Sequence, residues 1–192
     1  MPKIGLQKPK YSIITVGTDS DGNETETYGE IKTFAKAVTA NTSINTSKLK
    51  FYADDTVSEM INEFLNGTIT MAVDDIENTV LGDITGATVG EDGTVTMKDN
   101  DTAKYLRLGF IVRRYKNNKS EYRAVIFAKV MFDIPADDYE TKGESIVFKS
   151  ETVTGEIMRN YNHDWKLMSP WDESEKTALT WLDTNLKPSA VT

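Results

Sequence analysis

The pattern of apolar and polar residues along this chain predicts a protein built mainly of β-strands. Residues 69–73 alternate between large apolar side chains and smaller ones, which is the two-residue period of a half-buried strand. Segments rich in β-branched and aromatic residues predict further strands at 11–16, 31–38, 48–53, 56–61, 145–153 and 155–159. Asn66 and Gly67 fit either a tight hairpin turn or a bulge, and the pattern does not choose between them.

Residues 104–134 form the longest predicted unit, a β-hairpin. One face of its first strand is apolar and carries Leu106, Leu108, Phe110 and Val112. Asn117 and Asn118 tolerate positive φ angles and supply the reversal. The return strand is expected to present one apolar face with Tyr122, Ala124, Ile126, Ala128, Val130, Phe132 and Ile134. Its opposite face is also apolar, so this strand needs cover on both faces.

Two helices are predicted. A short helix over 75–81 would be stopped by Gly82. A longer helix over about 170–186 would be capped by Ser169, with Pro170 at its first position. Its apolar residues recur at helical spacing, so we expect it to pack on the sheet.

The predicted fold class follows from these elements. It is mainly β, with one short helix, a flanking C-terminal helix and a long protruding hairpin. The expected organisation is an N-terminal arm over 1–10, a single domain over 11–187 and a C-terminal tail over 188–192.

Charge is divided unevenly along the 192 residues, whose net charge is −8. Residues 54–101 contain 12 acids and one base, whereas residues 104–129 contain eight bases and one acid. Such asymmetry predicts complementary protein surfaces, and the overall negative charge argues against a dedicated nucleic-acid binder. The chain has no cysteine, which excludes disulfides and thiolate chemistry. Its most apolar stretch is too short to span a bilayer, and no signal peptide is expected.

Candidate catalytic residues are few. The single histidine, His163, lies in an Asn-His-Asp turn, and the chain has no Gly-x-Ser-x-Gly elbow and no Gly-Lys-Ser/Thr phosphate loop. The carboxylate pairs fit turn and cap positions better than a glycosidase site, because neighbouring residues on a strand point to opposite faces. These pairs are Asp54–Asp55, Asp74–Asp75 and Asp137–Asp138. We therefore expect no enzyme.

A calcium loop is the one metal site that the sequence suggests. Asp19, Asp21, Asn23 and Glu30 match liganding positions of an EF-hand loop. Glu24, however, stands where that loop needs glycine, and no helices flank it. We prefer a hairpin loop and expect no metal and no cofactor.

Several segments, taken in order, give the chain a family resemblance. They are residues 48–55 (Lys-Leu-Lys-Phe-Tyr-Ala-Asp-Asp) with Val57 and Glu59, then Phe64 and 67–76, the aromatic strand from Ala124 with Lys129 and Phe132, Pro135, residues 141–146 (Thr-Lys-Gly-Glu-Ser-Ile), Thr154-Gly155, Asp164-Trp165-Lys166, and the helix with Ala178, Trp181 and Leu182. This ordered set resembles the major tail proteins, or tail-tube proteins, of bacteriophages with long non-contractile tails, chiefly those of Gram-positive hosts. The helix over 75–81 lacks the proline that many relatives have near its start.

The resemblance implies a two-sheet β-sandwich or partly open barrel of the tail-tube type, in a structural virion protein without an active site. Copies would form rings of six, inner strands would join into a barrel, and rings would stack into a tube that conducts DNA without binding it specifically. The implied partners are other copies of the chain, a tape-measure protein, and the terminator and distal tail proteins; no membrane is involved. Assembly would take place in the host cytoplasm.

The charge pattern suggests which residues would meet between subunits. We expect a basic hairpin end with Arg113, Arg114, Tyr115, Lys116, Asn117, Asn118 and Lys119 to contact acids of a neighbouring copy, with candidates Asp54, Asp55, Asp74 and Asp75. The alternative is a carbohydrate- or receptor-binding β-sandwich on a virion or cell surface, for which Trp165, Trp171 and Trp181 are the candidate platform.

Overall fold

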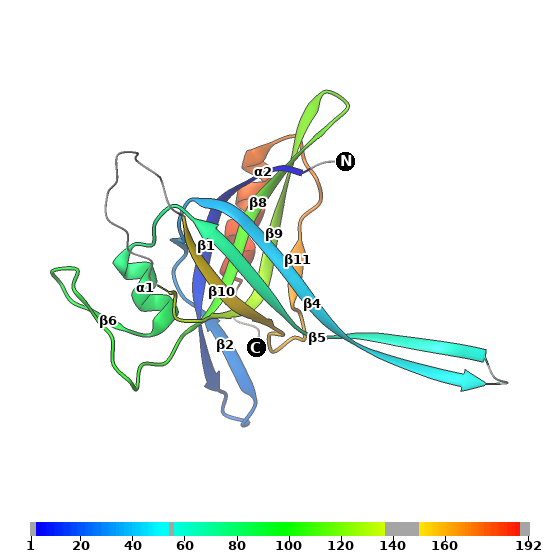
Figure 1. Ribbon diagram of the computed structural model, residues 1–192, viewed down its shortest axis with the longest axis horizontal. Coiled ribbons are helices and arrows are strands. Elements are labelled where there is room, and N and C mark those ends of the chain that lie inside the picture. The colour runs from blue at the N-terminus through cyan, green and yellow to red at the C-terminus, as the bar shows by residue number, and fades with distance from the viewer. Residues whose placement is uncertain (1–2, 54–55, 137–149, 189–192) are drawn as a thin grey trace.

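The computed structural model describes residues 3–53, 56–136 and 150–188, and the side chains of these residues except 3, 51–53 and 56–59 (Figure 1). The strands are β1 (Lys3–Thr18), β2 (Glu24–Tyr28), β3 (Lys32–Thr33), β4 (Ala37–Ala53), β5 (Thr56–Val73), β6 (Thr88–Val89), β7 (Val95–Thr96), β8 (Tyr105–Lys116), β9 (Lys119–Phe132), β10 (Glu151–Met158) and β11 (Lys166–Met168). The helices are α1 (Asn78–Thr85) and α2 (Glu175–Leu186). Neither helix is long and apolar enough to cross a membrane.

All described strands except β6 and β7 form one antiparallel sheet that folds over itself. Its order is β2-β1-β8-β9-β10-β5-β4, with β3 paired to β1 and β11 paired to β9, while β6 and β7 make a separate small hairpin. In Figure 1 the half with β4, β5 and β10 lies in front of the half with β1, β8 and β9. Within the described residues β4 pairs only with β5, so the sheet does not close into a barrel. The predicted mainly-β, sandwich-like fold is confirmed.

The main core lies between the two halves of the sheet, and a second apolar cluster lies under α2. The main core contains side chains from both halves, among them Tyr11, Met71, Leu108, Phe127 and Val153. The second cluster joins Ile111, Ala124 and Ile126 to Ala178, Leu182 and Leu186 of α2. Strand β9 is therefore covered on both faces, as its sequence predicts.

The β8–β9 hairpin forms as predicted, but the predicted face of β9 is wrong beyond Phe127. Asn117 and Asn118 form the turn with φ angles of 49° and 61°. Leu106 pairs with Val130, whereas Leu108 pairs with Phe127, so β9 has one extra residue at this point. This bulge reverses the alternation, and Val130 and Phe132 lie in the main core rather than beside α2.

Both helices begin later than predicted, and the predicted stop of the first is wrong. Helix α1 continues past Gly82 and ends at Gly86, whose φ is 81° and whose N–H donates to the Gly82 carbonyl. Gly82 serves close packing instead, because a Cβ there would lie 2.4 Å from Val89 Cγ2.

Helix α2 begins at Glu175, not at residue 170, and its N-cap is Ser174, which accepts the Thr177 N–H. Ser169 is buried, and its Oγ accepts the Ala124 N–H. Tyr122 and Asp172 exchange backbone hydrogen bonds. This bridge holds the segment before α2 in an extended form beside β9, so the helix starts only after it.

Three predicted strands have different limits in the structure. The strand predicted over 11–16 extends back to Lys3, so the described part of the predicted N-terminal arm over 1–10 pairs with β8. The strand predicted over 31–38 is reduced to β3 and the start of β4, which runs on through residues 41–47. The strand predicted over 145–153 lies partly outside the described residues and begins in the structure at Glu151.

Near Asn66 and Gly67 the structure has the bulge and not the turn. Asn45 pairs with Asn66 and Thr46 with Phe64, so Leu65 is the extra residue. Gly67 allows close packing here, since a Cβ would lie 2.7 Å from Ile44 Cδ1.

Candidate functional site

The most prominent feature is a long two-stranded arm, residues 45–53 and 56–66, which continues β4 and β5 away from the body (Figure 1). Strand β10 pairs with β5 only between Gly67 and Val73, so beyond this point β4 and β5 have only each other among the described strands. About ten residues in each strand span roughly 30 Å at about 3.3 Å per residue. A ribbon of two strands is only marginally stable in water, so the arm is an element that gains from a partner.

Apolar side chains of the arm face solvent. Leu49, Met60, Ile61 and Leu65 are each more than half exposed, at 63%, 58%, 51% and 59%. Leu49 lies directly opposite Ile61 in the register. Clustered apolar side chains on a protruding element indicate a contact surface.

The base of the arm is fixed to the body. The Phe64 ring stacks on Trp165, with centroids 4.6 Å apart and planes inclined by 6°. The Arg159 guanidinium lies 5.6 Å above the Phe64 ring and donates to the Phe64 carbonyl. The arm is therefore positioned at its root and has no cover from described elements further out.

The predicted basic hairpin end is the turn between β8 and β9, and much of its charge is paired within the chain. Arg114 lies 2.5 Å from a Glu121 carboxylate oxygen, and Lys119 lies 2.7 Å from Glu173. Arg113 donates to Ser120 Oγ. Asn117 and Asn118 make the turn, and Tyr115 is 46% exposed. Of these bases, Arg113 and Lys116 have no carboxylate partner among the described residues.

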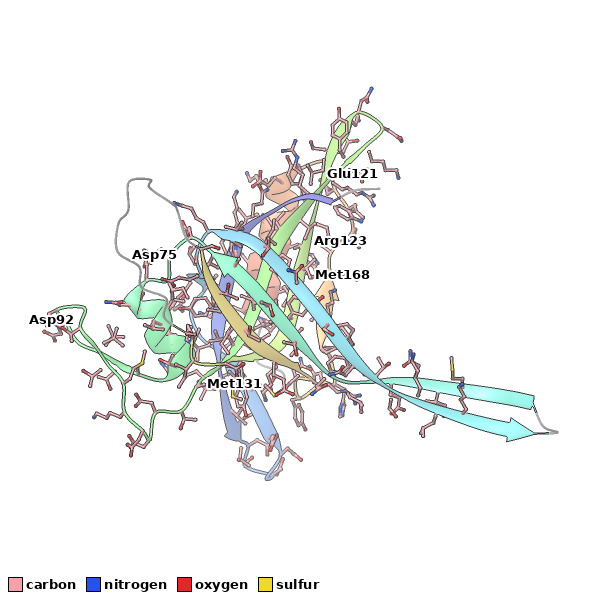
Figure 2. All side chains as sticks on the ribbon, viewed as in Figure 1. Asp75, Asp92, Glu121, Arg123, Met131 and Met168 are labelled. Atoms are coloured by element: carbon pink, nitrogen blue, oxygen red, sulfur yellow. The ribbon has the colours of Figure 1, made fainter. Side chains whose placement is uncertain are left out.

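The acidic candidates lie on other elements. Asp74 follows β5, accepts the Lys36 N–H and lies 3.6 Å from Lys36 Nζ. Asp75 lies beside α1, at a distance from Glu121 at the β8–β9 end in Figure 2. Asp54 and Asp55, like the pair Asp137–Asp138, lie outside the described residues. Within one chain the described structure therefore does not bring the acidic and basic candidates together.

A groove of about 250 Å³ opens between β4 and the first half of β1. It is lined by Gly5, Leu6, Ala40, Thr42, Phe110, Val112, Arg123, Val125, Phe127, Lys166, Met168 and Trp171. Its walls combine apolar side chains with two cationic ones, Arg123 and Lys166. Figure 2 shows Arg123 and Met168 close together next to β4.

Residues of the groove contact Arg123 but, within the described structure, leave one of its hydrogen-bond donors without an acceptor. Its guanidinium carbon lies 4.8 Å from the Trp171 ring centroid, and Arg114 approaches the same ring at 4.0 Å. Arg123 Nη1 lies 4.0 Å from Met168 Sδ, a weak acceptor. Arg123 Nε is buried and has no hydrogen-bond partner in the described part of the chain. The sequence does not reveal this site, because its residues come from β1, β4, β8, β9 and the segment around β11.

The other candidate sites do not assemble. His163 is exposed in a turn, as predicted, with φ of 64° and its N–H donating to the Asn160 carbonyl. Asp19 accepts the N–H groups of Asp21 and Asn23 at the turn between β1 and β2, whereas Glu30 pairs with Lys187. The two ends of the proposed calcium loop thus have separate partners, and no group of three or more potential metal ligands occurs among the described residues.

The three tryptophans occupy separate surroundings. Trp165 stacks on Phe64, Trp171 lines the groove, and Trp181 packs from α2 against the second cluster. No shared aromatic platform follows from these contacts.

Comparison with known proteins does not assign a family. No protein-family model matches the chain, and a search of curated proteins gives no match.

Proposed function

We propose that this protein is the structural subunit of a phage tail tube. Copies assemble into stacked rings of six around a tape-measure protein, and the finished tube conducts DNA into the host. Ring number, the terminator and distal tail partners, and assembly in the host cytoplasm follow from the family resemblance of the sequence. The mainly-β sandwich and the flanking α2 agree with that resemblance.

The observation that carries this proposal is the arm. It projects from the body, exposes Leu49 and Ile61 on one face, and has no described partner in its own chain. When a surface on one copy binds a different surface on the next, the contacts either close into a ring or continue as a filament. In a tube of stacked rings, the contacts within each ring close and the contacts between rings continue along the tube.

The charge agrees with the role of a DNA conduit. The net charge of −8 repels the phosphate backbone, so DNA can pass without being held.

Negative-stain electron microscopy of the concentrated protein tests the proposal. We expect hollow tubes from the natural chain and folded monomers from a Leu49→Ser/Ile61→Ser double variant, because the substitutions remove apolar contacts from an exposed face. Ile134→Ser is the matched control, since Ile134 is 72% exposed on the body rather than on the arm. It should form tubes like the natural chain.

The proposal would be contradicted by a chain that stays monomeric at every concentration and binds a specific glycan on an array, which would favour the surface-binding module. Normal tube formation by the double variant would leave the tube intact and remove the arm from assembly.

A further inference from the structure

We propose that the groove between β1 and β4 receives the arm of a second copy, with Leu49 and Ile61 against its apolar walls and Glu63 paired with Arg123. This inference rests on the proposed self-assembly and names the two surfaces that would carry it. It differs from the charge-pairing expectation drawn from the sequence, which relied on the turn between β8 and β9.

The groove contains a hydrogen-bond donor, Arg123 Nε, that lacks an acceptor among the residues that the structure describes. Buried polar groups in folded proteins are almost always hydrogen-bonded, and Arg123 Nε is a buried donor without a partner in the described residues. Its neighbours Phe110, Val125 and Trp171 are apolar or aromatic. An occupant that combines apolar side chains with a carboxylate fits this lining, because a carboxylate forms a charged hydrogen bond with the guanidinium of Arg123, a partly buried residue whose Nε is buried.

The groove suits a strand better than a small molecule. Enclosed ligand pockets usually have about 300–1,000 Å³. This groove has about 250 Å³ and is partly open, enough for a few side chains. Two strand edges border the groove without a ladder partner among the described strands: the outer edge of β4, and the edge of β1 at Gly5 and Leu6 that faces away from β8. Unpaired edges recruit additional strands.

One face of the arm has the required composition. Leu49 is opposite Ile61, and Ser47 is opposite Glu63, in a stretch of the ladder without a bulge. Because side chains alternate along a strand, Leu49, Ile61 and Glu63 share one face. Glu63 is exposed and has no ion-pair partner in the described residues. The opposite face carries Met60 and Lys50.

The arm cannot enter the groove of its own chain. Ala40 and Thr42 of β4 line the groove, and the same strand continues past Asn45 into the arm. Because β4 stays paired with β5, the arm continues the sheet. From the point where it leaves the body, the arm therefore points away from the groove (Figure 2). The occupant is therefore the arm of another copy, and the contact joins two unlike surfaces.

Disulfide cross-linking between engineered cysteines tests the assignment, because the natural chain contains no cysteine. Met168 lies on the groove and is 52% exposed, so the test chain carries Ile61→Cys and Met168→Cys. The control chain carries Met60→Cys and Met168→Cys, since Met60 is similarly exposed on the opposite face of the arm. On a non-reducing gel we expect the test chain to shift from monomer to a ladder of linked chains, and the control chain to shift little.

The outcomes separate this inference from the proposed function. Normal tubes without cross-links in the test chain, or with equal cross-linking in both chains, would overturn the groove assignment and leave the tube intact. Selective cross-linking of the test chain, with no tubes from the natural chain, would support the groove and overturn the tube. No cross-links in the test chain and no tubes from the natural chain would overturn both.

Discussion

At the scale of single residues, the buried carboxylate of Asp83 ties several elements together. Asp83 lies in the last turn of α1, where the helix dipole disfavours negative charge. It accepts hydrogen bonds from Tyr11 Oη at 2.9 Å, Lys32 Nζ at 2.5 Å and Lys104 Nζ at 3.0 Å. The cluster therefore joins α1 to β1, β3 and the segment before β8.

The pKa values of this cluster reflect its burial and its charges. Burial acts to raise the pKa of Asp83, but the bonds from Lys32, Lys104 and Tyr11 outweigh it and hold the pKa below its usual 3.8. Burial, together with the Asp83 charge, raises the pKa of Tyr11 well above its usual range. Tyr11 therefore stays protonated and remains a donor at any physiological pH.

Asp83→Asn should destabilise the monomer by about 1–3 kcal/mol at neutral pH, because it removes charged hydrogen bonds from a buried site. Urea unfolding followed by circular dichroism measures this difference. Asp75→Asn is the matched control, since Asp75 is exposed and should change stability by less than about 0.5 kcal/mol.

The difference between wild type and Asp83→Asn should also depend on pH. A carboxyl group whose folded pKa is depressed stabilises the fold above its unfolded pKa and loses that contribution as the pH falls through the folded value. The two proteins should therefore converge in stability in acid, below the usual Asp pKa of 3.8. A difference that stays constant from neutral pH into acid would show that the Asp83 charge does not stabilise the fold.

At the scale of elements, local sequence patterns predicted which strands and turns exist better than they predicted where these elements begin and end. The alternation in 69–73 and the Asn117–Asn118 reversal were both correct, because each depends on neighbours in sequence. The reversal of faces in β9 comes from a bulge opposite β8, and a bulge is a property of two paired strands. Gly82 likewise looked like a stop, but its role depends on Val89 packing against it.

The start of α2 can be used to test whether the local capping residue or a tertiary contact determines where the helix begins. Ser174→Ala should cost about 1 kcal/mol as the loss of an N-cap, and Ser174→Asp should keep most of the stability because aspartate also caps. Ser169→Asp should be far more harmful, since it places a charge at a site that is 4% exposed. Thermal unfolding of the three variants measures the order. If Ser169→Asp were tolerated and Ser174→Asp were not, the cap would be at Ser169.

The candidate site was less predictable than the fold. Charge runs in the sequence pointed to the β8–β9 turn, but Glu121 and Glu173 pair with its bases, and Glu173 is far along the chain. The groove could not be foreseen, because Leu6, Thr42 and Trp171 meet only after the sheet folds over. The exposed face of the arm shows as a strand pattern in the sequence, yet its lack of a partner among the described strands is a fact of topology.

At the scale of the whole molecule, charge repulsion opposes assembly, whereas apolar contacts between copies favour it. The net charge of −8 makes copies repel one another, and residues 54–101, which include α1, β6 and β7, contain 12 acids and one base. The proposed contact between copies is mainly apolar, through Leu49 and Ile61, with one ion pair to Arg123. The bases of the β8–β9 turn are partly neutralised within the chain, which leaves little net attraction between unlike ends.

Salt should therefore promote polymerisation rather than prevent it. Electrostatic screening shortens from about 10 Å at about 0.1 M salt to about 3 Å at about 1 M, which removes repulsion between copies and leaves apolar contacts in place. Light scattering and sedimentation across this range should show tubes forming at lower protein concentration as salt rises. The Leu49→Ser/Ile61→Ser variant should stay monomeric throughout, which separates specific assembly from salting out. If salt instead dissolves the tubes, attraction between acidic and basic ends drives assembly, and the basic turn between β8 and β9 regains the role that its charge suggests.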